Sequence, residues 1–160
     1  MKTKLMSIMV SEKQHAPGHK YRHTLVQHIL QAGYPIDIYG RGAATYRQNK
    51  DTRIKGEYKE LEPYEHYEFH ICIENFMTNA YFSEKVTNTL LCGATPIYLG
   101  CGRILNYFPA NVICLSGNIV KDMTLLREII LHPRKYKAAL NIEKIKDKLN
   151  LLKNAEALFL

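Results

Sequence analysis

Short runs of almost continuously apolar residues alternate with segments of helical periodicity, and this alternation limits what the chain can fold into. Residues 5–10, Leu-Met-Ser-Ile-Met-Val, form the first such run. From His19 to about Gly33 the chain then carries a single apolar stripe at helical spacing. A strand that is apolar on both faces is typical of a parallel sheet that helices cover on both sides. The first third of the chain therefore predicts a strand followed by a covering helix.

The same alternation continues to the end of the chain. Further strands are predicted at residues 36–40, 67–73, 95–100 and 112–115, and further helices at residues 83–91, 122–131 and 134–157. Residues 43–64 are predicted to be a long irregular segment, whose acidic end a solvated loop or exposed helical turns explain. The whole pattern predicts an α/β fold with a doubly wound, Rossmann-like parallel sheet. Ligands of such sheets bind beyond the carboxyl ends of the strands.

Composition fits one globular domain spanning residues 1–160, because 46% of the 160 residues are hydrophobic and 23% are charged. Since no apolar run approaches the roughly 20 residues that cross a bilayer, no membrane span is predicted and a cytoplasmic location is expected. The formal net charge of +7 indicates a phosphorylated or polyanionic partner. Many of the basic residues lie in the predicted last helix, where a solvated helix face is the ordinary explanation. A phospholigand or nucleic-acid binding module that uses this helix is the alternative function.

Polar residues that could bind a ligand cluster around the strand predicted at 67–73. Glu74 and Asn75 follow this strand, and Ser83, Glu84 and Lys85 open the next helix. A helix N-terminus presents free N–H groups and partial positive charge, so a phosphate fits there and Lys85 would add a full charge. Glu84 could accept hydrogen bonds from sugar hydroxyls. The alternative, in which Ser83 caps the helix and the other two side chains are merely exposed, stays open.

Metal binding is not predicted. His19 and His23 have the spacing of two metal ligands on a helix, but no glutamate follows His19 and no third ligand is indicated. The sequence also contains no Asp-x-Asp pair, a motif that can hold a metal ion. We therefore expect no metal and no further cofactor beside the ligand itself.

Four segments resemble a known family in both order and spacing. They are Tyr-Glu-Phe-His-Ile-Cys-Ile-Glu-Asn at 67–75, Tyr-Phe-Ser-Glu-Lys-Val at 81–86, Gly-Ala-Thr-Pro-Ile-Tyr-Leu-Gly at 93–100 and Pro-Ala-Asn-Val-Ile at 109–113. This pattern is similar to the signature of glycosyltransferase family 10, the α1,3/α1,4-fucosyltransferases. The resemblance extends over about residues 5–130. It departs from the signature at Phe76, where the family has a small polar residue, and at Ser83, which replaces a threonine.

The resemblance implies a donor site for GDP-fucose made of six residues: Arg22, Glu74, Asn75, Tyr81, Glu84 and Lys85. In that site Arg22 and Lys85 would neutralise the diphosphate, and Glu84 would hold ribose or fucose hydroxyls. Asn75 and Tyr81 would line the site, which Glu74 directly precedes. An arginine fork matches phosphate geometry and a lysine adds a point charge, so charge supports the two cations independently.

The resemblance also implies a two-domain enzyme of the GT-B type, with an acceptor-binding half first and a donor-binding half second. This chain resembles only the second half, and we expect the N-terminal acceptor domain to be absent from it. Inverting transfer of fucose to a glycan acceptor needs a general base. The family's base resembles a glutamate of the first half, so no catalytic residue is nominated here. The expected partners are a GDP-sugar donor, a glycan acceptor and the acceptor-binding domain or chain, with no nucleic acid.

Overall fold

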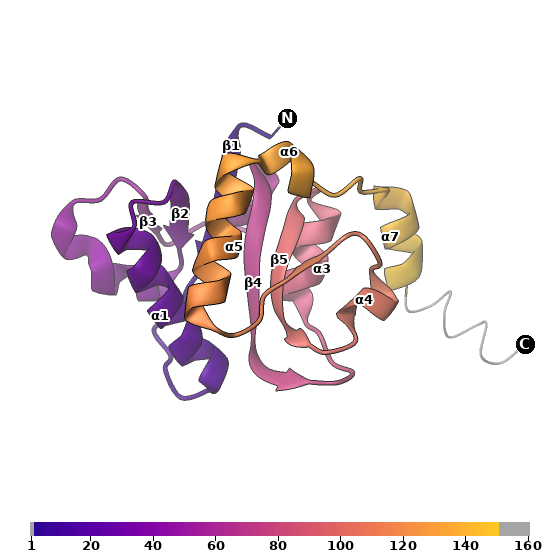
Figure 1. Ribbon diagram of the computed structural model, residues 1–160, viewed down its shortest axis with the longest axis horizontal. Helices are drawn as coiled ribbons and strands as arrows, with labels where there is room; N and C mark the ends of the chain where they lie inside the picture. The colour runs from indigo at the N-terminus through magenta and orange to yellow at the C-terminus, as the bar shows by residue number, and fades with distance from the viewer. Residues whose placement is uncertain (1, 151–160) are drawn as a thin grey trace, which may run out of the picture.

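The structure, a computed structural model, describes residues 2–150 (Figure 1). A six-stranded sheet in the order β3-β2-β1-β4-β5-β6 forms its centre, and every neighbouring pair of strands is parallel. The strands are β1 (Lys4–Met9), β2 (Ile36–Tyr39), β3 (Ile54–Gly56), β4 (Tyr67–Thr78), β5 (Thr95–Cys101) and β6 (Ile113–Cys114). The predicted α/β fold with a doubly wound parallel sheet is thereby confirmed.

Helices cover both faces of the sheet (Figure 1). The helices are α1 (Pro17–Gln31), η1 (Arg41–Asn49), α2 (Glu62–Glu65), α3 (Glu84–Leu91), α4 (Ile104–Tyr107), α5 (Ile119–Leu131), α6 (Pro133–Tyr136) and α7 (Ile142–Leu149). Helices α1 and α5 contact each other on one face, and α3 and α7 contact each other on the other. Each face buries a separate apolar cluster, to which Leu25 and Leu126 belong on the first face and Val86 and Ile145 on the second.

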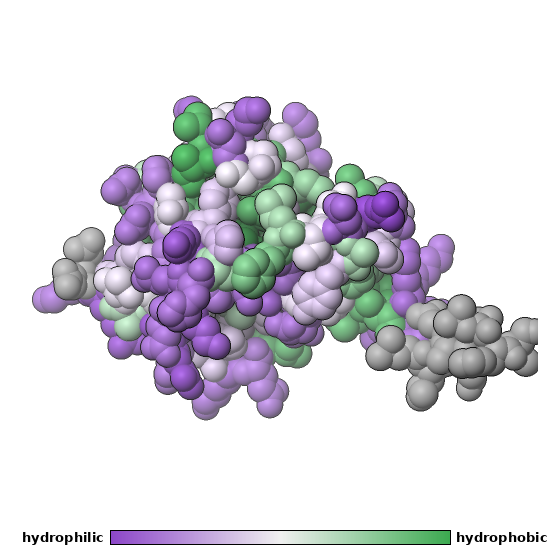
Figure 2. All heavy atoms as spheres, turned by 90° about the horizontal axis from the view of Figure 1, so that it is seen from below, coloured by the Kyte–Doolittle hydropathy of each residue, from purple (hydrophilic) through white to green (hydrophobic). Residues whose placement is uncertain are grey.

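The strand order reverses between β1 and β4. From β1 the chain winds outward through β2 to β3, returns to place β4 on the other side of β1, and continues outward through β5 to β6. The loops that follow β1 and β4 therefore leave the sheet in opposite directions, which opens a crevice at their carboxyl ends. Figure 2 looks onto this end of the molecule, where hydrophilic side chains dominate the surface and smaller hydrophobic areas lie between them.

Two predicted segments differ from the structure. The segment 43–64 is not irregular throughout, because it contains most of η1, all of β3 and most of α2. Strand β3 pairs with β2, and Arg53, directly before β3, donates hydrogen bonds to the carbonyl oxygens of Ile29 in the last turn of α1 and of Tyr34 in the loop after it. These long-range bonds order a stretch whose local sequence has no strong periodicity.

The single helix predicted at 134–157 is also wrong within the described residues. The chain leaves α6 at Lys137, whose backbone is extended, and Ala138 donates its N–H to Thr95 Oγ1 at 3.0 Å. Asn141 then caps a new helix, α7, by accepting a hydrogen bond from the N–H of Lys144. This break allows Ile145 to be buried on the α3 face. The part of the predicted helix after residue 150 lies outside the described residues.

None of the helices in residues 2–150 is both long enough and apolar enough to cross a membrane.

Candidate nucleotide site

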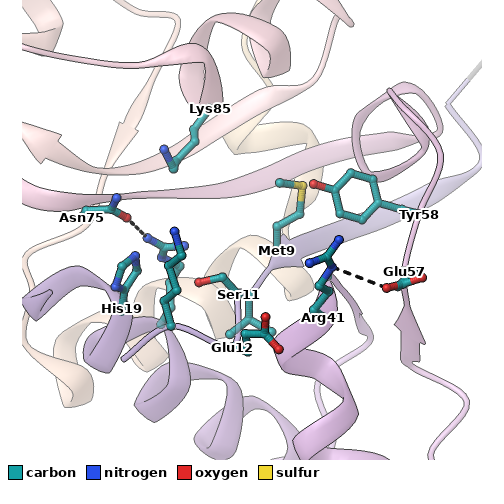
Figure 3. A pocket seen from close by; sticks show the side chains of 13 residues that line it. Met9, Ser11, Glu12, His19, Arg41, Glu57, Tyr58, Asn75 and Lys85 are labelled. Atoms are coloured by element: carbon teal, nitrogen blue, oxygen red, sulfur yellow. Dashed lines mark hydrogen bonds and ion pairs between the residues drawn. The ribbon is translucent and has the colours of Figure 1, made fainter. Parts of the chain in front are cut away.

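A cavity of about 640 Å³ lies at the carboxyl ends of β1, β2 and β4, where the strand order reverses (Figure 3). Its lining comes from residues 9–13 after β1, the first two turns of α1, the ends of β2 and β3, Asn75 of β4 and Lys85 of α3. The volume lies within the range of small-molecule sites. The cavity therefore occupies the position that the fold class predicts for a ligand.

Strand β4 sends its two neighbouring polar residues to opposite faces of the sheet. Successive side chains of a strand alternate between faces, so Asn75 points toward α1 and Glu74 toward α3. Asn75 Oδ1 accepts a hydrogen bond from Arg22 Nη2 at 2.5 Å, whereas Glu74 binds Ser83. Both residues lie within β4, which continues to Thr78, and not after a strand that ends at residue 73 as the sequence predicts.

Arg22 is the most distinctive residue of the cavity. Its side chain is buried, and its Nε has no hydrogen-bond partner among the described residues. Burial lowers the pKa of Arg22 from its ordinary value, while the charge of Glu74 opposes this shift. A buried guanidinium is normally paired or hydrogen-bonded at each nitrogen. The Arg22 side chain thus brings a buried positive charge to the lining of the cavity.

Gly18 sets the distance between α1 and β4. A Cβ atom at this position would lie 1.8 Å from the carbonyl oxygen of Glu74 and 3.0 Å from that of Asn75. Only a glycine therefore permits the first turn of α1 to pack directly on the β4 backbone. Arg22 follows one turn later on the same helix and thus reaches Asn75.

Glu74 organises the start of α3. Its buried carboxylate accepts hydrogen bonds from the N–H of Ser83 at 2.8 Å and from Ser83 Oγ at 2.8 and 2.9 Å. Ser83 is the N-cap of α3, which is one of the two possibilities that the sequence left open. The Nζ of Lys85 lies 3.4 Å from Glu74 Oε2 and 3.0 Å from Ser83 Oγ. The Glu74 carboxylate thus holds the ammonium group of Lys85, and Lys85 lines the cavity.

The structure brings some of the predicted donor-site residues together and leaves others apart. Arg22, Asn75 and Lys85 line the cavity, and Glu74 lies directly behind Lys85. Tyr81, in the loop before α3, is 62% exposed and does not line it. Glu84 also lies outside the lining, with its exposed carboxylate 3.3 Å from Lys85 Nζ. The roles expected for Tyr81 and Glu84 stay predictions.

The two histidines considered as a metal pair have other partners. His19 lines the cavity and its Nδ1 accepts the N–H of Ala16 at 3.3 Å; burial lowers the pKa of its imidazole, and the charge of Arg22 lowers it further. Both ring nitrogens of His23 form hydrogen bonds, one with Tyr46 Oη and one with the carbonyl oxygen of Ser11. Residues 2–150 contain no group of three or more His, Cys, Asp or Glu side chains placed to hold a metal ion.

Sequence reasoning missed the opposite end of the cavity, which Arg41, Glu57 and Tyr58 line (Figure 3). Glu57 and Tyr58 follow β3, a strand of only three residues, so their position at the carboxyl edge of the sheet is not evident from periodicity. Their only local signal is an acidic and an aromatic residue side by side after a glycine. Because the surrounding stretch is polar, a solvated loop accounts for these two residues equally well.

A doubly wound sheet with a cavity at its switch point defines a Rossmann-like fold with a candidate ligand site, which Arg22 and Lys85 line. Comparison with known families is more specific: residues 1–112 match the model described as glycosyltransferase family 10 (fucosyltransferase) C-term. The chain belongs to this family, and the resemblance found in its sequence is confirmed.

Individual relatives are distant. A chicken (Gallus gallus) protein, GDP-fucose protein O-fucosyltransferase 3, is 24% identical over 124 residues, which make up 76% of this chain and 25% of the chicken protein. Among solved structures, an α1,3-fucosyltransferase with GDP-fucose has a TM-score of 0.61 at 19% identity, over 92% of this chain and 46% of the other. The same kind of enzyme with GDP has a TM-score of 0.61 at 18% identity, over 96% and 48%. The chain thus spans about half the length of these solved enzymes, and the likeness supports the fold.

Proposed function

We propose that this chain is the donor-binding domain of a fucosyltransferase and that it binds GDP-fucose in the cavity between β1 and β4. The observation that carries this proposal is Arg22, a buried guanidinium in the lining of that cavity whose Nε has no hydrogen-bond partner within residues 2–150. The diphosphate lies between Arg22 and Lys85. Family membership and the ligands of the two solved relatives, GDP-fucose and GDP, support this choice of donor.

The neighbouring residues position the two cations. Asn75 orients the Arg22 guanidinium through its 2.5 Å hydrogen bond. Glu74 and Ser83 hold the Lys85 ammonium at the N-terminus of α3, where the helix dipole adds to its positive charge. Glu84, whose carboxylate lies 3.3 Å from Lys85 Nζ, and Tyr81, in the loop before α3, then face the sugar end of the donor. There the Glu84 carboxylate accepts hydrogen bonds from fucose or ribose hydroxyls.

The complete reaction requires more than donor binding. Inverting transfer needs a general base that removes a proton from the acceptor hydroxyl, and the residues of the cavity include no carboxylate that we assign to this role. We propose that an acceptor-binding domain, on the same polypeptide or on another chain, supplies the base and the glycan acceptor site. This chain then contributes the activated sugar and the positive charge that stabilises the departing diphosphate.

A thermal-shift comparison tests the proposed ligand. At concentrations near 100 times its Kd, GDP-fucose should stabilise the chain by about 2.7 kcal/mol, which raises Tm by about 5–10 °C for a protein of this size. UDP-sugars at equal concentration should produce little shift, and GDP-mannose shows whether the sugar also contributes. Saturable stabilisation that added salt barely changes supports a specific site, whereas steeply salt-dependent binding of polyanions alone would support a nucleic-acid module instead.

Chelation should leave GDP binding intact. Two protein cations already face the expected position of the diphosphate, so a divalent ion is not needed to neutralise it. We expect the Kd for GDP, measured by calorimetry, to agree within about threefold with and without EDTA, a difference below roughly 0.65 kcal/mol. A greater dependence on metal would contradict this expectation, and His19 and His23 would be the first ligands to examine.

A further inference from the structure

The end of the cavity away from the proposed diphosphate position is lined by side chains of a different kind. Figure 3 shows Lys85, Asn75 and His19 at one end, and Tyr58, Arg41 and Glu57 at the other. The first end offers positive charge to an anion. The second offers an aromatic ring, a donor-only guanidinium and an acceptor-only carboxylate, which suit a flat ligand with both acceptor and donor groups on its edge.

Backbone contacts place Arg41 and Glu57 beside each other. Gly40, at the end of β2, donates its N–H to the carbonyl oxygen of Gly56, at the end of β3, at 2.6 Å. Gly40 has a φ of 97°, and a Cβ atom there would lie 2.3 Å from the carbonyl oxygen of Val10. The ends of β1, β2 and β3 are thus drawn together, and the residues that follow the two glycines become neighbours at the cavity.

The Tyr58 ring is supported from the sheet side. It meets the buried ring of Tyr39 edge to face, at a centroid distance of 6.3 Å and an interplanar angle of 87°. Tyr39 is itself fixed by a 2.8 Å hydrogen bond between its hydroxyl and that of Tyr67, which donates to Asp37. Tyr58 nevertheless stays 38% exposed, so it is an oriented ring that still has surface available to a ligand. Stacking on such rings is a common way to hold a base.

Arg41 and Glu57 form only a loose pair with each other. Their Nε and Oε1 atoms are 3.5 Å apart, and the side chains are 74% and 78% exposed. Exposed pairs of this kind contribute little to stability, so a ligand can separate them at small cost. The Watson–Crick edge of guanine carries the O6 acceptor beside the N1–H and N2–H donors. An arginine matches O6 and a carboxylate matches the two N–H groups, whereas adenine presents the opposite order of donor and acceptor.

We infer that Glu57 and Arg41 recognise the guanine base of the donor and that Tyr58 supports its ring. This inference rests on the proposed binding of GDP-fucose and assigns the specificity of that site for guanine to residues after β2 and β3. The nucleotide then lies along the cavity with its base at Tyr58, its diphosphate between Arg22 and Lys85, and its sugar directed to Glu84.

The substitution Glu57→Gln tests the inference because it keeps the size of the side chain and removes the acceptor-only charge. Affinities of the wild-type chain and the variant are measured by calorimetry for GDP, ADP and inosine diphosphate, which lacks the N2 amino group. We expect the wild type to prefer GDP over both, and the variant to lose about tenfold or more of each preference. Glu12→Gln is the matched control, since Glu12 lines the same cavity and the change alters its charge equally.

Loss of the GDP preference in Glu57→Gln but not in Glu12→Gln supports the inference. If both variants keep the wild-type preference, or if the wild-type chain binds GDP and ADP equally well, the assignment of Glu57 is overturned while the diphosphate site stands. If the wild-type chain binds none of the three nucleotides, the proposed function fails as well, and the inference fails with it. Equal Tm values for the variants and the wild type show that folding does not cause the differences.

Discussion

Replacing Lys85 with alanine should weaken GDP binding about 10- to 150-fold, and replacing Arg22 should have an effect at least as large. Each change removes a charge-assisted contact to the diphosphate, worth about 1.5–3 kcal/mol. Arg22 is the stronger case because it is buried and, in the part of the chain that the structure describes, its Nε has no hydrogen-bond partner. Calorimetric titration with GDP gives the affinities, and Tm is measured for each variant because Lys85→Ala also removes the 3.4 Å contact between Lys85 Nζ and the buried carboxylate of Glu74.

Lys20→Ala is the control for net charge. Lys20 lies on α1, two residues before Arg22, but its side chain is exposed and does not line the cavity. Its replacement by alanine changes the net charge of the chain by the same amount as Lys85→Ala or Arg22→Ala. Its effect on GDP affinity should be small in physiological salt, where exposed charges are screened. Equal GDP affinities for wild type, Lys85→Ala and Arg22→Ala would show that the diphosphate does not bind between these two side chains.

Local pattern accounts for most of the fold. Apolar runs such as residues 5–10 identify strands that are covered on both sides, and the stripe that includes Leu25 and Ile29 identifies a helix with one buried face. Both properties depend on neighbours in sequence, so they are visible without the structure. Alternation of the two then leaves a doubly wound parallel sheet as the arrangement that covers every apolar surface. The cavity at the switch point follows from that topology.

Features that depend on contacts between residues far apart in the chain could not be predicted as well from the sequence. The end of α6 depends on a hydrogen bond from Ala138 to Thr95, 43 positions earlier in the chain, and no local signal in a lysine-rich stretch reveals it. Glu74 and Asn75 were predicted as one polar pair after a strand, but β4 continues past them and separates them onto two faces. This separation explains why one supports Lys85 and the other orients Arg22.

The two cations of the candidate site could therefore be predicted from the sequence, but the full extent of the site could not. Lys85 can be found because positive charge at a helix start after a buried strand has a known use, and Arg22 is identified through the resemblance to the family. Glu57 lies far from them in sequence, after a strand of three residues that exists only because it pairs with β2. A residue whose position depends on tertiary pairing has no periodic signal of its own, which is why the end of the cavity that Glu57 lines became evident only from the structure.

Gly18→Ala should destabilise the fold although alanine is the better helix former. Alanine gains at most about 1 kcal/mol of helix propensity over glycine. Against this gain, its Cβ atom would lie 1.8 Å from the carbonyl oxygen of Glu74, a backbone atom that cannot rotate away. Overpacking typically costs about 1–3 kcal/mol, and the closeness of this contact places the cost at the upper end. We expect a net loss of about 1–2 kcal/mol, or a Tm lower by about 2–8 °C.

The same substitution should also reduce GDP affinity, because relief of the contact moves α1 away from β4 and draws Arg22 away from Asn75. Gly102→Ala is the matched control: a Cβ atom there would come no closer than 3.3 Å to Asn79 Oδ1, the end of an adjustable side chain. Thermal unfolding and GDP titration of both variants separate the two effects. If Gly18→Ala matches Gly102→Ala in Tm and in affinity, the packing of α1 on β4 does not hold Arg22 in place, and another contact must position the guanidinium.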